Sequence, residues 1–149
     1  MASTTFSGPV TSTNGFIGAL TGNIAGTGSI THATTAAINA TATATAAEVA
    51  TGYITSTSVG TVTITLPTGT LLGAALGAAR GTVFDLYIDN TAGATAVTVL
   101  VATNGIKSDA AATTAASFGQ STVAFGATGI GRFTIMFSSA TAYVFTRTA

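Results

Sequence analysis

Apolar and polar residues alternate most clearly between residues 61 and 66. There, Val62, Ile64 and Leu66 alternate with three threonines, which is the two-residue period of a strand with one buried face. β-Branched side chains favour this conformation, and Pro67 follows where strand pairing has to stop. The pattern therefore predicts a strand over 61–66.

After Pro67 the period changes to that of a helix. Apolar residues recur at the spacing of one helix face: Leu72, Ala75, Leu76 and Ala79. Thr68 is suited to cap the start, and Arg80 and Gly81 are suited to close the end. We predict a single short helix of about three turns here.

Further strand patterns lie on both sides of this segment, at 52–59, 83–88, 96–101, 121–125, 131–137 and 142–147. Turn-forming residues fill 89–95, and the small-residue stretch 107–120 predicts a loop at the rim, facing solvent or a neighbouring subunit. Large side chains occupy both faces of 83–88, so we expect another subunit to cover its outer face.

These elements predict an all-β fold, an antiparallel β-sandwich of jelly-roll kind with one short helix. The residues expected in the core or in subunit packing are Leu66, Leu72, Leu76, Phe84, Leu86, Val99, Phe133, Ile135, Phe137 and Phe145. We expect the sandwich to span 52–149, after an Ala/Thr-rich connector with a first strand at 32–51.

Residues 1–31 form an extended, Gly-rich N-terminal arm in this prediction. The arm has only isolated large apolar residues and is unable to close a core of its own. One interpretation is that it docks on a partner through Phe6, Pro9, Val10, Phe16 and Ile17. A plain flexible tail is the alternative.

The composition favours assembly. Hydrophobic residues make up 47% of the 149 residues, charged residues only 5%, and the formal net charge is zero. Soluble domains ordinarily contain about 25% charged residues. A surface with so little charge is poorly protected against association, so we expect much of it to be buried against other protein copies.

Several functional classes are disfavoured by the sequence. The four basic residues are scattered, which argues against nucleic acid as a partner, and the longest apolar run is about half of a membrane span. The first residues do not resemble a secretion signal, and the absence of cysteine suits a reducing cytosol.

Catalytic or metal chemistry is not indicated either. His32 is the only histidine and has no triad around it, and Asp85 and Asp89 are two carboxylates where Ca²⁺ requires six or more oxygens. Asp89 with Asn90 indicates a turn, and the glycines at 126–131 suggest a hairpin. We expect no enzyme activity, cofactor, metal or small-molecule substrate.

The chain resembles a class of tailed-phage virion proteins, the capsid decoration proteins, also called cement or head-fibre proteins. In these a strand ending in Leu-Pro-Thr leads into an Ala/Leu helix, then a G-x-x-F-x-x-x-x-x-N strand and a Val/Thr strand. The matching positions are Leu66, Pro67 and Thr68, then Gly81, Phe84 and Asn90, then 97–99. The resemblance covers 45–149 and, with less agreement, the arm, whereas 33–44 does not align.

The resemblance implies a homotrimer that is made in the host cytoplasm, binds the major capsid protein on the outer surface of the virion and stabilises the head. Two alternatives stay open. One is the tip of a trimeric fibre. The other is a β-domain that binds a glycan or ice through a flat threonine array, which requires several stacked strands; the sequence shows one such strand and no repeat.

Overall fold

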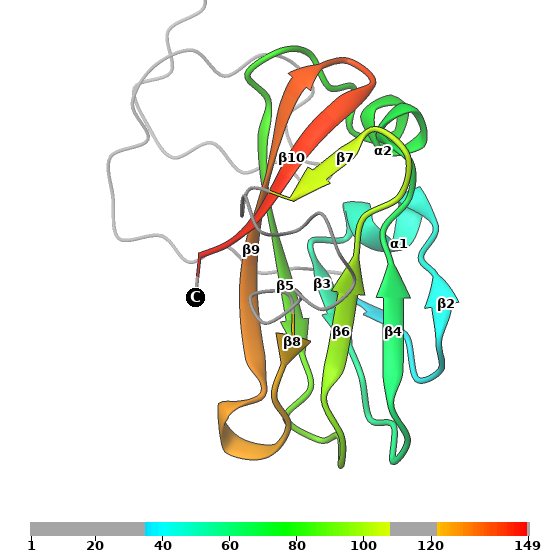
Figure 1. The fold of residues 1–149 in the computed structure, drawn as a ribbon, viewed down its shortest axis with the longest axis vertical. Helices are drawn as coiled ribbons and strands as arrows, with labels where there is room; N and C mark the ends of the chain where they lie inside the picture. Colours follow the sequence, from blue (N-terminus) through cyan, green and yellow to red (C-terminus); the bar gives the residue numbers. More distant parts are fainter. Residues whose placement is uncertain (1–34, 108–121, 149) are drawn as a thin grey trace, which may run out of the picture. The chain divides into compact units, whose positions relative to one another are not determined.

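The computed structural model describes residues 35–107 and 122–148, which fold into two β-sheets and two α-helices (Figure 1). The six-stranded sheet contains, in spatial order, β1 (Ala36–Ala37), β3 (Tyr53–Thr55), β5 (Val83–Asp89), β9 (Ile130–Ser139), β10 (Ala142–Arg147) and β7 (Gly105–Lys107). The four-stranded sheet contains β2 (Ala42–Thr43), β4 (Val62–Thr65), β6 (Val97–Leu100) and β8 (Thr122–Val123).

The chain changes sheet at every step from β1 to β8. Among these eight strands, the odd-numbered ones join the six-stranded sheet and the even-numbered ones join the four-stranded sheet. The pairs β1–β2, β3–β4 and β5–β6 are therefore successive rungs of a coil, and we call them the first, second and third rungs. Equivalent residues of the rungs lie side by side, for example Ile54 beside Ile88 and Ile64 beside Val99.

The sheets are mixed. Strands of successive rungs are parallel, whereas β5–β9, β9–β10 and β6–β8 are antiparallel. The two-sheet, mostly β architecture is as predicted, but the antiparallel prediction is wrong for the rungs. Antiparallel neighbours are usually joined by hairpins, and here the consecutive strands of the rungs lie in different sheets.

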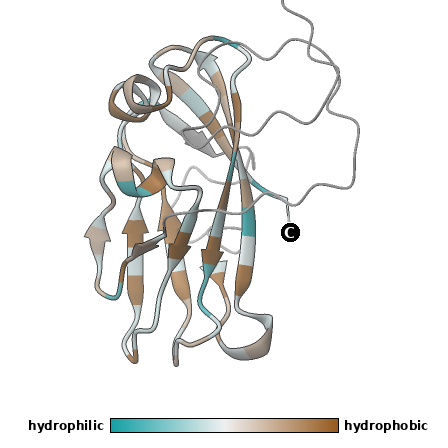
Figure 2. Cartoon of the chain, turned by 180° about the vertical axis from the view of Figure 1, so that it is seen from behind, coloured by the Kyte–Doolittle hydropathy of each residue, from teal (hydrophilic) through white to brown (hydrophobic). Residues whose placement is uncertain are grey.

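One hydrophobic core joins the two sheets, and Figure 2 shows the apolar residues on the strands that enclose it. Of the residues expected there, Leu66, Leu72, Leu86, Val99, Phe133, Ile135, Phe137 and Phe145 are buried, and Leu76 and Phe84 are partly buried against the core. The rings of Phe133 and Phe145 stack with centroids 4.8 Å apart. Such contacts add to the stabilisation that burial provides.

The first rung already belongs to this core, because Ala36, Ile38 and Ala44 are buried. The first rung covers this end of the core only in part. Ala42 lies beside Ile64 in the register yet is exposed, and an open hollow of about 320 Å³ is lined by residues of this rung.

Helix α2 (Gly69–Leu76) starts where the sequence predicts and ends earlier. The predicted cap is confirmed, since the Thr68 Oγ1 accepts a hydrogen bond from the Leu71 N–H at 3.3 Å. Gly77 has a φ of 58° and ends the helix, so the prediction that it continues to Ala79 is wrong. Its buried face is Leu72 with Gly69 and Gly73, because the helix backbone packs directly on the turn between β9 and β10.

A second helix, α1 (Ala46–Ala50), was not predicted. Its start is a capping box: the Thr45 N–H donates to Glu48 Oε2 at 2.7 Å, and the Glu48 N–H donates to Thr45 Oγ1 at 3.2 Å. Val49 is buried, so the core holds the short helix in place. The prediction of a single helix is therefore wrong.

The glycine-rich segment between β8 and β9 is not a hairpin, which corrects the interpretation of 126–131. It forms a 3₁₀ turn, η2 (Gly126–Thr128), and leads from the four-stranded sheet to the six-stranded sheet. Gly126 has a φ of 70°, which favours glycine there.

Candidate functional site

The sequence-predicted functional residues lie partly outside the described residues. Outside the described residues lie His32 and the five arm residues, Phe6, Pro9, Val10, Phe16 and Ile17. The loop expected at 107–120 also lies outside them, except for Lys107 at the end of β7. The surfaces that the structure describes are therefore the source of the candidate site.

The outer face of the six-stranded sheet carries large apolar side chains together with charged ones, Asp85 and Arg132. Val83, Met136 and Val144 form one row across β5, β9 and β10, and the exposed fractions of Val83 and Met136 are 58% and 51%. The neighbouring rows on this face are polar and aromatic. Large exposed apolar side chains that gather on one face indicate an interaction surface.

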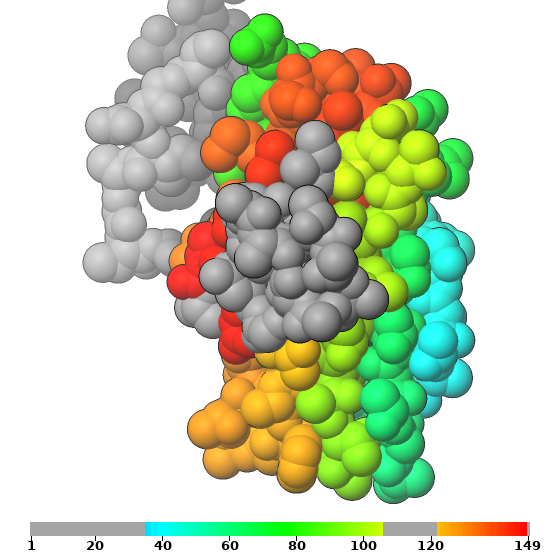
Figure 3. Space-filling view, viewed as in Figure 1, coloured from blue at the N-terminus to red at the C-terminus, as the bar shows by residue number. Residues whose placement is uncertain are grey.

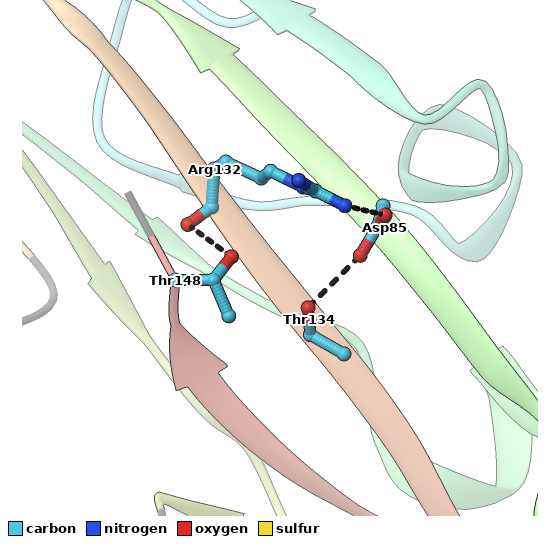
Figure 4. Close-up of polar contacts among 4 residues, drawn as sticks. All are labelled: Asp85, Arg132, Thr134 and Thr148. Carbon is cyan, nitrogen blue, oxygen red and sulfur yellow. Dashed lines mark hydrogen bonds and ion pairs between the residues drawn. The ribbon is translucent and has the colours of Figure 1, made fainter.

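Asp85 and Arg132 form an ion pair in the middle of this face (Figure 4). The Arg132 Nη2 lies 2.6 Å from Asp85 Oδ2, and the Thr134 hydroxyl donates to Asp85 Oδ1 at 2.9 Å. The hydrogen bond from Arg132 is the main cause that lowers the pKa of Asp85, and the same bond raises the pKa of Arg132. The exposed pair adds little to stability and fixes the position of the guanidinium.

Two tyrosines extend this cluster across β3 and β5. The rings of Tyr53 and Tyr87 stack with centroids 6.4 Å apart, and Arg132 Cζ lies 5.8 Å from the centroid of the Tyr87 ring. The Tyr53 hydroxyl donates to Asp89 Oδ2 at 2.8 Å, which raises the pKa of Tyr53. We call Tyr53, Tyr87, Asp85, Asp89 and Arg132 the tyrosine–arginine cluster.

Asp89 also makes the turn that the sequence suggests. Its Oδ1 accepts hydrogen bonds from the Thr91 hydroxyl at 2.6 Å and from the Thr91 N–H at 2.9 Å. The hydroxyl contact is the main cause that lowers the pKa of Asp89. Asp85 and Asp89 are therefore each held by their own partners. In the described ranges no group of three or more His, Cys, Asp or Glu residues is placed to hold a metal ion.

The outer face of the four-stranded sheet carries threonines. Thr63 lies beside Thr98, Thr98 beside Thr122, and the Thr63 N–H donates to the Thr41 hydroxyl at 3.1 Å. A second row contains Thr43 and Thr65. Figure 3 shows β2, β4 and β6 side by side on this face. The threonine pattern seen on one strand in the sequence therefore continues onto neighbouring strands in the first row, whereas the second row meets Leu100 on β6.

The tyrosine–arginine cluster was not predicted from sequence, and the threonine array was raised as an alternative on one strand only, without its neighbours. Their members lie far apart in the chain and meet only through the register, and the rungs differ in length, so no repeat is visible. The alternation of Asp85 and Tyr87 with Leu86 and Ile88 shows which residues share a face, but not which strand lies beside them.

Protein-family models, curated proteins and solved structures yield no match to this chain. Among the helices that the structure describes, none is long and apolar enough to cross a membrane.

Proposed function

We propose that this chain is a structural virion protein, a decoration protein that binds the outer surface of a phage capsid as a homotrimer and stabilises the head. Its partners in this proposal are the major capsid protein and its own copies. The function is mechanical and involves no catalysis and no cofactor. The trimer number and the capsid come from the sequence resemblance, and the proposal does not depend on a jelly-roll topology.

The outer face of the six-stranded sheet is the observation that carries the proposal. Val83 and Met136 are more than half exposed there, in a protein with 5% charged residues. Next to them lies the tyrosine–arginine cluster, and Tyr, Met and Arg are the residue types enriched in protein interfaces. Its ring stack and ion pair hold these side chains in place, which reduces the entropy lost on binding. We assign this face to contacts between subunits.

Sedimentation equilibrium of the full chain tests the subunit contact. We expect a trimer at micromolar concentration, and we expect Met136→Glu to dissociate it, because a charge would be buried without a partner. Thr61→Glu is the matched control, because Thr61 is exposed directly before β4 of the other sheet and is expected to tolerate the same charge. A folded wild-type monomer contradicts the homotrimer.

Deletion of residues 1–31 tests the role of the arm. The chain divides into units at 1–30 and 31–149, so the deletion falls close to a natural boundary. We expect the truncated protein to bind undecorated capsids of the encoding phage more weakly, because three arms on one trimer bind multivalently. Equal binding and equal protection of the capsids against heat would show that the arm is a plain tail.

A second candidate function is binding of a neutral, regular surface such as a glycan or ice. The row of Thr63, Thr98 and Thr122 on three neighbouring strands supports it, with hydroxyls spaced about 4.8 Å across the strands. Ice recrystallisation assays and pull-down on insoluble polysaccharides test this function. Thr63→Tyr is expected to abolish binding. Thr70→Tyr is the control, because Thr70 is exposed on α2 and lies outside the threonine rows. Inactivity of the wild type excludes this candidate.

A further inference from the structure

The first rung leaves the same edge of both sheets unpaired. Among the described strands, none lies beside β1 or β2 on the side away from the second rung, and Figure 1 shows β2 at the border of its sheet. We call this side of β1 and β2 the open edge. The Ile38 N–H donates to the Thr55 carbonyl on the inner side, so the backbone groups of Ala37 point to the open edge, as do those of Thr43 on β2. Such an edge accepts a further strand.

The core is also incompletely covered at the open edge. Ala42 is exposed although it lies in register with Ile64, which is fully buried. The hollow of about 320 Å³ lies here, against Ile38 and Ala42. Coils built from stacked repeats need a cap where the last repeat would otherwise expose its apolar face. The open edge is therefore suited to a strand pair that brings one apolar side chain to each sheet.

Residues 22–31 have the order of apolar and polar residues that such a pair requires. They lie outside the described residues, but the structure shows which positions of the first rung face inward, and these can be compared. With a shift of fourteen positions, Ile24 and Ile30 correspond to Ile38 and Ala44, which are both buried. Hydroxyl residues correspond at the exposed positions, with Thr27, Ser29 and Thr31 in place of Thr41, Thr43 and Thr45.

The connection between the two segments is long enough for this arrangement. If Thr31 lies beside Thr45, the chain has to cross from the four-stranded sheet to the six-stranded sheet before Thr35, which directly precedes β1. Packed sheets are about 10 Å apart, and four residue steps span up to about 14 Å. A segment attached this closely also has a far higher effective concentration at the open edge than a separate protein has.

We propose that residues 22–31 of the same chain pair with β1 and β2 as a further rung, with Ile24 beside Ile38 and Ile30 beside Ala44. The partner of the open edge is then the chain itself, and the edge is closed to strands of other proteins. This inference does not depend on the proposed function. The five predicted docking residues all precede position 22, so they stay available to a partner.

An engineered disulfide in the full chain tests the register. The chain has no cysteine, so Ser29→Cys combined with Thr43→Cys creates a single pair of thiols. Neighbouring strands would place the two Cα atoms about 4.8 Å apart, within the range of a disulfide. Gly28→Cys with Thr43→Cys is the matched control, because a shift of one residue turns the thiol to the other face of the strand. We expect the first pair to oxidise within one chain at least about tenfold faster than the control.

Thermal melts of the full chain provide a second readout. Ile24→Asp and Ile30→Asp would each place a carboxylate against the core, so we expect each to lower the melting temperature by at least about 4 °C. Leu20→Asp is the control, because Leu20 lies outside the segment that matches the first rung. We expect its melting temperature to equal that of the wild type.

The outcomes decide the inference in both directions. Faster oxidation of the first pair within one chain, together with lower melting temperatures for the two isoleucine variants, supports it. Equal oxidation of the two cysteine pairs, or unchanged melts of both isoleucine variants, overturns it. A disulfide that forms only between two chains also overturns it, because residues 22–31 of a sister copy would then occupy the open edge.

Discussion

Asn90 shows how much one buried polar residue contributes to this fold. Asn90 is fully buried, and its Nδ2 donates to the carbonyls of Thr95 at 2.9 Å and Ala124 at 2.8 Å. Replacement by alanine leaves these two carbonyls without their donor and opens a cavity. We expect Asn90→Ala to lower the free energy of unfolding by about 2 to 4 kcal/mol. Urea denaturation measures this loss. Asn39→Ala is the control. Asn39 is exposed and its Oδ1 accepts a hydrogen bond from the Thr57 N–H, so we expect its replacement to cost about 1 kcal/mol or less.

Two phenylalanines in different environments provide a second prediction. Phe133 is fully buried between the sheets, so Phe133→Ala is expected to lower the free energy of unfolding by about 3 to 5 kcal/mol. Phe125 is half exposed, and Phe125→Ala is expected to change it by no more than about 0.5 kcal/mol. Equal losses in thermal melts of the two variants contradict this difference in burial between Phe133 and Phe125.

Tyr143 predicts a loss of stability in alkaline solution. Its hydroxyl is buried and donates to the Pro67 carbonyl at 3.0 Å, and burial raises its pKa from 10.0 to about 12. The unfolded chain therefore gives up this proton first. The contribution of Tyr143 is complete below pH 10 and decreases as the pH rises from 10 to about 12. Urea denaturation between pH 10 and 12 is expected to show that the free energy of unfolding depends less on pH in Tyr143→Phe than in the wild type. The same slope of this free energy against pH in both proteins rules the mechanism out.

At the scale of elements, we expect a glycine-to-alanine substitution in α2 to destabilise the protein, although helix propensity alone would favour alanine. Alanine normally stabilises a helix by about 1 kcal/mol relative to glycine. At Gly73, however, the added methyl group would collide with the Ala140 carbonyl and push the helix away from the turn between β9 and β10. We expect Gly73→Ala to destabilise the protein by about 1 to 3 kcal/mol. Thermal melts measure it against Ala75→Gly, an exposed control in the same helix.

The elements also show what the sequence was able to predict. Side-chain periodicity identified β4, β5, β6, β9 and β10 and the start of α2, because these patterns are local. It did not identify their partners, since pairing depends on loops that carry the chain from one sheet to the other. Helix α1 was missed because Ala and Thr have opposing preferences, and its stability depends on the capping box and on the burial of Val49. The tyrosine–arginine cluster was missed for the same non-local reason.

At the scale of the whole molecule, the proposed trimer predicts that stability depends on concentration. If subunits bury the outer face of the six-stranded sheet, dilution favours the unfolded chain by mass action. We expect the melting temperature to rise with protein concentration, and to rise less for Met136→Glu. Differential scanning calorimetry over a hundredfold range of concentration measures this. A constant melting temperature would exclude a subunit contact that contributes to folding.

The alternation of strands between the two sheets also affects how the chain folds during synthesis. Each rung is complete before the next leaves the ribosome, and β3 and β5 join an edge that already exists. Strand β5, however, also pairs with β9, which is made much later. We therefore expect the three rungs to wind in order while the other edge of β5 stays open until β9 and β10 are released. Nascent chains at this stage are the ones most exposed to wrong pairing with a neighbour.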